Sequence, residues 1–508
     1  MEKKIPAVNP ATGEETAHVK AADDKQIKDA FKKSKKSLEN WKDLSVGQRC
    51  KYLKRFRENV LEDLEDIVST IKEDTGKSDI EILMSDILAT LEITKYYEEN
   101  APDILKKEKR KTPFEFRKNY SYVEYEPYGT VSVISPWNYP FQLSVVPAIT
   151  ALIGGNTVVL KPSEITPLTG EKIKELFEKS GFPEGVFQVL QGTGEVGEKM
   201  IEEKPDKVFF TGGVETGKKV MEKASKQLIP VELELGGNDP FIVFKDADID
   251  RAVKGLVYGA LANSGQLCVS SERVYVERDV KKEFMEKLEK ELEKVRVGGN
   301  STYEMGPIIR EKQIEKIKEH VEEAVLEGAE MLTDFERNGN FLKPVLLDKV
   351  DHDMNVMREE TFGPVIPVTS FKGIEEAVGL ANDTEYGLNA SVWSEDIEKA
   401  EKVASKLETG NCYINDVVKN IGNPHLPFGG VKKSGIGRYH GPEGLKSFVQ
   451  PKSVMVSGNT IDEINWFPYD KKLCKSIAKL IKTKYGKKGF LKKIKNYFSL
   501  RKEMLGRD

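Results

Sequence analysis

The stretch GTVSVISPWNYPFQLSVVPAITALIGGNTVVLKPSE, residues 129–164, decides the fold of this chain. It opens with the β-rich run TVSVI at 130–134 and closes with a second run, TVVL, at 157–160. Two more short β-rich runs follow at 186–190 and 207–210, and amphipathic segments such as 171–179 lie between the runs. Strands that alternate with helices at this spacing predict a parallel, doubly wound α/β sheet.

Further elements flank this region on both sides. The first 110 residues predict helices because apolar side chains recur there at helical spacing. A second α/β block begins near residue 236, with a strand at 273–276 and amphipathic helices after it. The helical apolar positions before residue 110 are Ile27, Ala30, Phe31, Leu38, Trp41, Leu53, Phe56, Val60, Leu64 and Val68.

Length and composition limit the class of protein. A chain of 508 residues is too long for one hydrophobic core, so two or three domains are expected. We expect no signal peptide, because polar sequence follows the first residues, and no membrane span, because the apolar stretch 143–160 is broken by proline and glycine. Four scattered cysteines indicate a reducing cytoplasm, and five scattered histidines without a Cys-x-x-Cys pair predict no metal site.

Three short motifs carry reactive side chains. Cys268 ends the segment NSGQLC, Glu234 opens ELGG, and Asn138 is the centre of PWNYP. A thiol nucleophile, a carboxylate base and an amide donor together can attack a carbonyl, stabilise an oxyanion and hydrolyse a thioester. Each residue also has a structural alternative: a buried cysteine, a surface glutamate and a turn asparagine. Glu232, two residues earlier, would point to the same face of the strand as Glu234 and is the alternative candidate for the base.

The order and spacing of these motifs resemble the aldehyde dehydrogenase superfamily, from NPATG at 9–13 to about residue 450. The resemblance implies that Cys268 attacks an aldehyde to form a thiohemiacetal. It implies that Asn138 and the Cys268 backbone N–H form the oxyanion hole. Glu234, directly before Leu-Gly-Gly, is then the base that hydrolyses the thioester to a carboxylic acid. Relatives that pass the acyl group to coenzyme A typically lack this glutamate.

The same resemblance implies a dinucleotide site made from three segments. The segment KPSE follows a strand, the glycine segment at 212–217 opens a helix, and ETFGPV at 360–365 matches a family motif. Glycines before a helix let backbone N–H groups approach a pyrophosphate. A carboxylate at Glu164 would repel a 2′-phosphate, which favours NAD over NADP, although Lys161 can accommodate either cofactor. The expected cofactor residues are Trp137, Lys161, Ser163, Glu164, Gly212, Gly213, Gly217, Leu235, Glu360 and Phe362.

A late signature, LPFGGVKKSGIGRYHG at 426–441, also matches the family, and its ending resembles the class 3 and fatty aldehyde branch. Its glycines are expected to make turns at the mouth of the active site. For His440 we expect a structural role in preference to acid–base chemistry.

The resemblance also implies a domain plan. Residues 1–118 and 128–235 are expected to form a Rossmann-like cofactor domain, and 236–448 an α/β catalytic domain. Segments 119–127 and 449–457 are the expected oligomerisation strands of a homodimer or homotetramer, because an exposed alternating strand would otherwise aggregate.

The last 51 residues, 458–508, are predicted to form a basic amphipathic tail. Segment 471–502 holds 13 Lys or Arg and no Asp or Glu, in a chain whose net charge is −4, so the rest is strongly acidic. Apolar side chains recur at helical spacing from Leu473 to Ile481 and again from Leu491 to Phe498. This pattern favours contact of residues 466–502 with an anionic membrane surface over packing on the oligomer, and it argues against nucleic acid. The expected location is cytoplasmic, peripheral at the membrane.

We therefore predict an NAD(P)-dependent aldehyde dehydrogenase that favours medium or long aliphatic aldehydes. Succinate semialdehyde is the alternative substrate, because the GQLCV context resembles dehydrogenases of that compound. A coenzyme A-acylating enzyme and an inactive membrane scaffold are the further alternatives.

Overall fold

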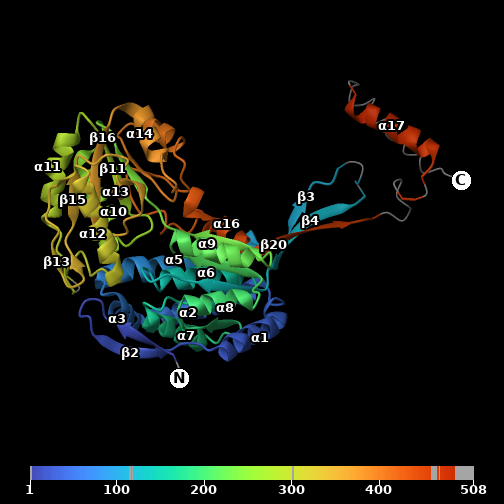
Figure 1. The fold of residues 1–508 in the computed structure, drawn as a ribbon. Helices are drawn as coiled ribbons and strands as arrows, with labels where there is room; N and C mark the ends of the chain where they lie inside the picture. The colour runs from blue at the N-terminus through green and yellow to red at the C-terminus, as the bar shows by residue number, and fades with distance from the viewer. Residues whose placement is uncertain are drawn as a thin grey trace. The chain divides into compact units, whose positions relative to one another are not determined.

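The computed structural model describes residues 3–113, 116, 118–299, 302–458, 466–467 and 469–486. The chain forms two compact units (Figure 1). The first unit comprises residues 1–106 and 125–451, and the second comprises 107–124 and 452–508.

The first sheet of the larger unit has the strand order β19-β9-β8-β5-β6-β7. All neighbours are parallel except β19 and β9. The chain leaves β5 toward β6 and β7, then returns to place β8 and β9 on the other side, so the order reverses beside β5. Open α/β sheets bind ligands at the carboxyl ends of the strands at such a reversal. The strands are β5 (Thr130–Ile134), β6 (Thr157–Lys161), β7 (Phe187–Val189), β8 (Lys207–Thr211), β9 (Val231–Glu234) and β19 (Gly435–Ile436).

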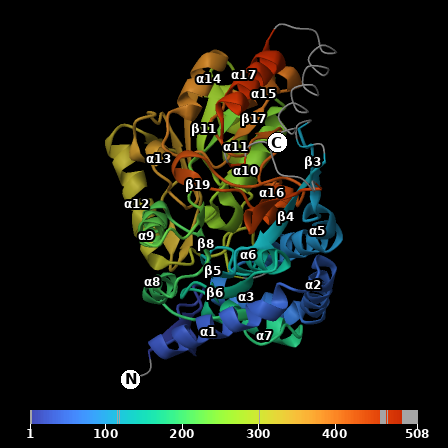
Figure 2. The same cartoon turned by 90° about the vertical axis from the view of Figure 1, so that its right-hand side faces the viewer.

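Helices cover both faces of this sheet because its strands are apolar on both faces (Figure 2). Val158 and Leu160 of β6 join the core formed with α2, α5, α6 and α7, whereas Val159 packs with α1 and α8. Near-continuous apolar runs are typical of parallel strands buried in this way. The helices are α1 (Asp24–Trp41), α2 (Val46–Glu62), α5 (Ala89–Ile104), α6 (Gln142–Ile153), α7 (Pro167–Lys179), α8 (Gly194–Glu202) and α9 (Val214–Ser225).

A second, mainly parallel sheet belongs to the same unit, with the order β12-β15-β16-β11-β10-β17-β18. Val274 and Val276 of β11 pack with α10 and α11, and Tyr275 packs on the opposite face with α12 to α15. Its strands are β10 (Asp239–Val243), β11 (Ser271–Glu277), β12 (Glu330–Met331), β15 (Val345–Asp348), β16 (Val365–Phe371), β17 (Ser391–Trp393) and β18 (Tyr413–Ile414). Its helices are α10 (Ile249–Leu261), α11 (Lys281–Leu292), α12 (Glu311–Leu326), α13 (Asn355–Arg358), α14 (Gly373–Asn382) and α15 (Ile397–Ala404).

Shorter elements complete this unit. They are β1 (Lys4–Val8), β2 (Glu15–Lys20), α3 (Leu64–Thr75), α4 (Asp79–Glu81), the π-helix η1 (Ile82–Leu88), the 3-10 turns η3 (Ala262–Gly265) and η4 (Lys432–Ser434), β13 (Arg337–Asn338), β14 (Phe341–Leu342) and α16 (Gly441–Ser447). The predicted α/β class with a doubly wound sheet and a second α/β block is confirmed. Both sheets lie in one compact unit, and the domain boundary at residue 235 stays a prediction.

The smaller unit contains most of a three-stranded sheet and one helix. Its sheet has the order β20-β4-β3, with β4 (Tyr120–Pro127), β20 (Val449–Val456) and β3 (Glu108–Arg110), the last of which the sequence analysis did not predict. Helix α17 (Lys471–Tyr485) follows, begun by the Asp470 side chain, which accepts the N–H of Leu473. The predicted second tail helix, 491–498, and Pro468 lie outside the described residues. Among the helices that the structure describes, none combines the length and the apolar character that crossing a bilayer requires.

Candidate active site

One cavity brings most of the predicted site residues together. Its volume is about 210 Å³, and it lies where the carboxyl ends of β5, β8 and β9 meet the loops that precede β11 and β16. The loops that follow β5 and β8 are the two that flank the reversal of strand order. The predicted residues that line the cavity are Trp137, Asn138, Gly212, Gly213, Glu234, Leu235, Cys268, Glu360 and Phe362.

The backbone before Cys268 is left-handed over three successive residues. Asn263, Ser264 and Gly265 have φ values of 51°, 58° and 74°. A Cβ on Gly265 would lie 2.3 Å from the carbonyl carbon of Gly363, so only glycine fits there. Each non-glycine residue with left-handed backbone angles destabilises the folded state by about 1–3 kcal/mol, and such residues persist only where surrounding contacts hold them. The strained turn therefore needs support from its neighbours.

Side-chain hydrogen bonds supply that support and join the Cys268 loop to the Asn138 loop. Asn263 Nδ2 donates to the carbonyl oxygens of Asn138 and Gln266, at 3.0 and 3.2 Å. Asn138 Nδ2 donates to the Gln266 carbonyl at 3.1 Å, and one hydrogen of its amide remains for another acceptor. Gln266 Nε2 in turn donates to the carbonyl of Asn263. The sequence analysis missed Asn263 and Gln266 as functional residues, although both lie in the quoted NSGQLC segment.

Cys268 lies in an acidic and apolar environment. Burial raises the pKa of its thiol, and the carboxyl groups of Asp239, Glu360 and Glu234 raise it further. Its own backbone N–H points toward the sulfur and opposes the rise. The thiol is therefore mainly protonated at neutral pH, and its reaction requires a group that removes the proton.

Glu234 and Glu232 both point into the protein from β9 but differ in their partners. Glu232 is paired with Lys207 Nζ at 2.8 Å and accepts the hydroxyl of Ser447 at 2.7 Å. The two carboxyl oxygens of Glu234 are buried and have no hydrogen-bond partner among the described residues. Burial raises the pKa of Glu234 well above its ordinary value, Glu232 adds to the rise, and Arg438 opposes it.

The loop of Glu360 and Phe362 closes the other side of the cavity. Glu360 Oε1 accepts the N–H of Gly237 at 3.1 Å, and the Phe362 ring lies edge-on to Trp137 with a centroid distance of 5.6 Å. Glu272 holds the loop by accepting the N–H groups of Thr361 and Phe362, both at 2.7 Å. Burial raises the pKa of Glu272, and the Glu360 carboxyl adds to the rise.

Two further residues of α12 contact this loop and line the cavity. Gln313 Nε2 donates to the Thr361 carbonyl at 2.7 Å, and Lys316 Nζ donates to the Glu360 carbonyl at 2.6 Å. The sequence analysis missed them because they lie more than 40 residues before the residues they contact and because α12 shows only ordinary helical periodicity.

The glycine segment after β8 leaves backbone N–H groups free at the start of α9. Among the described residues, no side chain caps this helix, and a Cβ on Gly213 would meet no atom within 4 Å. Gly217 has another role: a Cβ there would lie 2.6 Å from Leu235 Cδ2, so this glycine permits close packing of α9 on Leu235. The open space at Gly213, next to the N–H groups at the start of α9, suits a bound pyrophosphate.

The KPSE segment lies outside the cavity lining. Lys161 is buried and its Nζ lies 3.2 Å from Glu164 Oε2, whereas the Ser163 hydroxyl accepts the N–H of Ile165. Burial lowers the pKa of Lys161, and Glu164 opposes that change. The segment therefore presents a paired cation and anion at the end of β6.

Segment 426–441, the late signature, covers Glu234. Its glycines were expected to make turns at the mouth of the active site. β19 pairs antiparallel with β9, so Gly435 lies opposite Glu234, and a Cβ on Gly429 would lie 2.9 Å from Glu234 Oε1. His440 is fully buried against the rings of Tyr439 and Phe428, and burial lowers its pKa to about 3. A histidine that stays neutral here fits the expected structural role.

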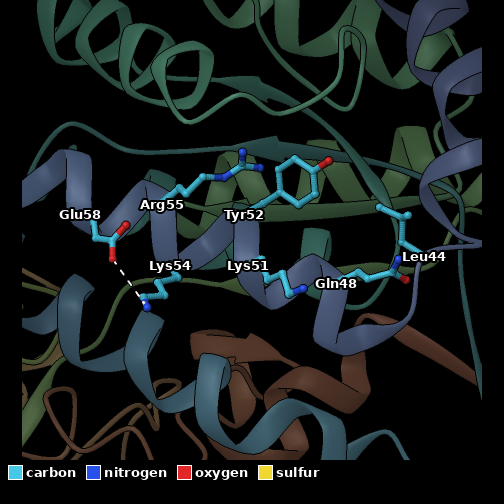
Figure 3. A pocket seen from close by; sticks show the side chains of 7 residues that line it. All are labelled: Leu44, Gln48, Lys51, Tyr52, Lys54, Arg55 and Glu58. Atoms are coloured by element: carbon cyan, nitrogen blue, oxygen red, sulfur yellow. Dashed lines mark ion pairs between the residues drawn. The ribbon is translucent and has the colours of Figure 1, made fainter.

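A larger hollow lies elsewhere, on the surface of α2 (Figure 3). Its volume is about 550 Å³, and Lys54 pairs with Glu58 one turn along the helix at 3.8 Å. The Arg55 guanidinium lies 4.3 Å from the centroid of the Tyr52 ring. The lining comes from α2 and the turn before it and contains none of the predicted reactive residues, so this hollow is not the candidate active site.

The comparisons with known proteins agree with this geometry. The chain is 45% identical over 467 residues to a 4,4′-diapolycopene aldehyde oxidase of Methylomonas sp, covering 92% of this chain and 88% of that protein. Among solved structures, betaine aldehyde dehydrogenase of Staphylococcus aureus in complex with NAD+ shares 33% identity and a TM-score of 0.86, over 92% of this chain and 94% of that one.

An NADP dependent enzyme of E. coli gives a TM-score of 0.86 at 32% identity, over 90% of this chain and 95% of that one. Residues 1–454 match the family described as the aldehyde dehydrogenase family. The chain belongs to the aldehyde dehydrogenase family and is an oxidoreductase that acts on aldehydes.

Proposed function

We propose that Cys268 is the nucleophile: its thiol first loses its proton to solvent, and the thiolate sulfur then adds to the aldehyde carbon. The tetrahedral thiohemiacetal that results carries negative charge on oxygen. The Asn138 amide and the Cys268 backbone N–H stabilise that charge, since Asn138 keeps one amide hydrogen after its bond to Gln266. The observation that carries this proposal is the single cavity that Cys268, Glu234 and Asn138 line together.

Glu234 is the base that activates water against the thioester. Its carboxyl oxygens lack partners among the described residues, and its raised pKa makes it a better proton acceptor once ionised. Glu232 does not take this role because Lys207 and Ser447 already engage its carboxylate. With a water nucleophile in place, the product is a carboxylic acid, and coenzyme A is not required.

The cofactor is NAD or NADP, with NAD favoured. When bound, it supplies the acceptor for the hydride that leaves the aldehyde carbon. The start of α9 at Gly212 and Gly213 would hold the pyrophosphate, and Lys161 with Glu164 would hold the adenosine ribose. Glu360 would hold the nicotinamide ribose, and Trp137 and Phe362, whose rings are in contact, would bind the nicotinamide end. The remaining predicted residues support the site: Leu235 lines the cavity, and Ser163 and Gly217 shape the backbone around it.

The substrate is a lipophilic aldehyde with a medium or long chain. Cys268 packs against an apolar cluster that contains Tyr139, Leu143 and Phe428. A neighbouring cavity of about 320 Å³ lies between η1 and α10, and its lining includes Met84, Leu261 and Ala262. Tyr139, next to Asn138, donates to Glu81 at the edge of that cavity. We assign this cavity to the hydrocarbon chain, and the name of the Methylomonas relative, an oxidase of a polyene aldehyde, supports a long apolar substrate.

Succinate semialdehyde is the second candidate because Arg310 lines the 210 Å³ cavity and could hold a carboxylate. The deciding experiment compares kcat/KM with NAD for hexadecanal, retinal, propanal and succinate semialdehyde. Preference for hexadecanal or retinal supports the lipophilic substrate. Preference for succinate semialdehyde, reduced by Arg310→Met, contradicts it. Turnover that depends on coenzyme A indicates an acylating enzyme, and no thiol-dependent turnover indicates the inactive scaffold.

The smaller unit has two roles in this proposal. β20 is an edge strand of the sheet β20-β4-β3, and pairing with another copy of the chain would cover it, giving a homodimer or homotetramer. Helix α17 carries exposed lysines, and Trp466, Phe467 and Tyr469 before it are exposed aromatic side chains. Aromatics and lysines together suit the headgroup level of an anionic bilayer, where a lipophilic aldehyde would be dissolved.

A further inference from the structure

A buried ion pair lies beneath the loop that carries Asn138. Lys77 Nζ is 2.9 Å from Asp86 Oδ2, and the two side chains are 1% and 0% exposed. Burying two charges costs desolvation energy that their mutual attraction often does not recover. Stability alone is therefore a weak explanation for this pair, and its contacts point to another role.

Both members of the pair contact residues next to Asn138. Lys77 Nζ lies 3.7 Å from the centroid of the Tyr139 ring, a distance at which a cation is attracted to the aromatic face. Asp86 Oδ1 accepts the N–H groups of Phe141 and Gln142 at 3.2 and 3.3 Å. These N–H groups begin α6, where negative charge is favourable. The pair thus holds the loop on the carboxyl side of Asn138.

A second carboxylate contacts the same loop. The Tyr139 hydroxyl donates to Glu81 Oε1 at 3.3 Å, and the backbone N–H of Asn263, in the strained turn, lies close enough to Glu81 to lower the pKa of its carboxyl. Burial raises the pKa of Glu81 to about 7, and Lys77 opposes the rise. Glu81 therefore connects the Asn138 loop to the strained turn before Cys268.

The π-helix η1 explains how two carboxylates reach one loop. Glu81 and Asp86 are five residues apart, which in an α-helix of 3.6 residues per turn would separate them by about 140°. Glu81 is the N-cap residue of η1 and Asp86 lies within it, and because hydrogen bonds in a π-helix join residues five apart, the two lie about one turn from each other. Single-turn π segments often occur at functional sites.

The segment before Lys77 is fixed against the Cys268 loop as well. A Cβ on Gly76, whose φ is 67°, would lie 2.4 Å from Pro307 Cγ. The Pro307 carbonyl accepts Gln266 Nε2 at 3.3 Å, and Gln266 is the residue whose carbonyl orients Asn138. Lys77 is therefore tied to both sides of the reacting centre.

We propose that Lys77, Glu81 and Asp86 are positioning residues that hold the Asn138 amide toward the reacting oxygen. They act through Tyr139 and the start of α6 and do not touch the substrate oxygen themselves. This inference rests on the proposed oxyanion role of Asn138.

The first test measures kcat per titrated Cys268 thiol and both KM values for Lys77→Met. Because the variant releases the donor loop, kcat falls about 100-fold, as for loss of one oxyanion donor, while the KM values for aldehyde and NAD change little. Lys77→Arg keeps the charge and restores part of kcat. Tyr139→Phe removes only the hydroxyl contact with Glu81 and lowers kcat about tenfold. This variant tests the proposal if Lys77→Met does not fold.

Non-additivity separates positioning from general destabilisation. Lys77→Met/Asn138→Ala is expected to be no slower than Asn138→Ala, because both changes remove the same donor. Arg57→Met is the control: it breaks the Arg57–Glu98 pair, 2.8 Å between α2 and α5, and should lower the melting temperature without changing kcat. Additive losses, or an unchanged kcat per thiol in Lys77→Met and Tyr139→Phe, would overturn the proposal.

Hydrogen exchange gives a readout that does not depend on turnover. In Lys77→Met, the amides of Phe141 and Gln142 lose protection, whereas those of β6 keep theirs. If the wild-type chain oxidises no aldehyde, the proposed function fails, yet this exchange result still decides whether the pair holds the loop. Unchanged protection at both amides contradicts the positioning role whatever the activity.

Discussion

Glu232 and Glu234 are two residues apart on β9, yet only Glu232 has its carboxylate neutralised, by Lys207 Nζ at 2.8 Å. Glu234 is also buried, and its oxygens have no hydrogen-bond partner among the described residues. An unpaired buried carboxyl is costly to a fold and is a common property of catalytic bases. The ion pair with Lys207 thus distinguishes Glu232 from Glu234 as candidates for the base, although both point to the same face of β9.

Glu234→Gln should trap the enzyme as the thioester. A first turnover still releases one equivalent of reduced cofactor per Cys268, because the amide leaves the nucleophile and the oxyanion donors in place. Steady-state turnover falls about 10²–10⁴-fold, since no base activates water. Stopped-flow absorbance of the reduced cofactor measures both phases. Glu232→Gln is the matched control: it leaves Lys207 buried without its partner and should lower stability while turnover per folded molecule persists.

Turnover limited by thioester hydrolysis should rise with pH as Glu234 ionises. The pKa of Glu234 is raised by burial, so lowering the pH below that value protonates the base and removes its activity. Arg438 opposes the rise, and Arg438→Met should move the inflection of the pH–kcat profile to higher pH. A flat profile, or an inflection that moves to lower pH, would contradict the assignment of Glu234.

Gly265→Ala should damage both stability and turnover. A methyl group there would lie 2.3 Å from the Gly363 carbonyl carbon, so the turn before Cys268 must shift away from Asn138. Thermal unfolding and kcat measure the two effects, and we expect a loss of about 100-fold or more in kcat. Gly13→Ala is a close control because Gly13 has a φ of 75° but nothing within 4 Å of its Cβ position. It should cost about 1 kcal/mol of stability and leave kcat unchanged.

Ala262→Trp should select against long chains by filling the 320 Å³ cavity. Exclusion of three methylene groups at about 0.8 kcal/mol each lowers kcat/KM for hexadecanal roughly 50-fold. The value for propanal should stay within a factor of about three, because a short chain does not extend into the cavity. Leu44→Trp, in the hollow on α2, is the control and should change neither value. Equal losses for both aldehydes would indicate a disturbed catalytic loop instead.

Contiguous patterns in the sequence predicted many of the elements and identified motifs that meet in one cavity. The run 130–134 is β5 with the same bounds, and the motifs that hold Asn138, Glu234 and Cys268 line one cavity. Local strand and loop patterns are visible in sequence because neighbouring residues create them. The strand β3 escaped prediction because its three residues, Glu-Lys-Arg, carry no apolar alternation.

Contacts between distant segments could not be predicted in the same way. Asn138 and Gln266 are 128 residues apart, and Glu272 lies 89 residues before Thr361. No local periodicity records such hydrogen bonds, because only the folded chain brings the segments together. Lys207, which distinguishes Glu232 from Glu234, likewise shows in the sequence only as a charged residue at the start of a strand.

Substitutions in α17 should test its contact with anionic lipid. Each lysine near such a surface contributes about 1 kcal/mol, so Lys475→Gln/Lys479→Gln/Lys482→Gln should weaken binding to phosphatidylglycerol vesicles about 100-fold at low salt. Cosedimentation measures the binding, which should disappear with phosphatidylcholine vesicles or at high salt. The control replaces three exposed lysines of α1, Lys25, Lys28 and Lys32, by glutamine and should leave binding intact. Equal weakening by both triple variants would indicate nonspecific attraction, and no binding by the wild-type chain would remove the membrane from the proposed function.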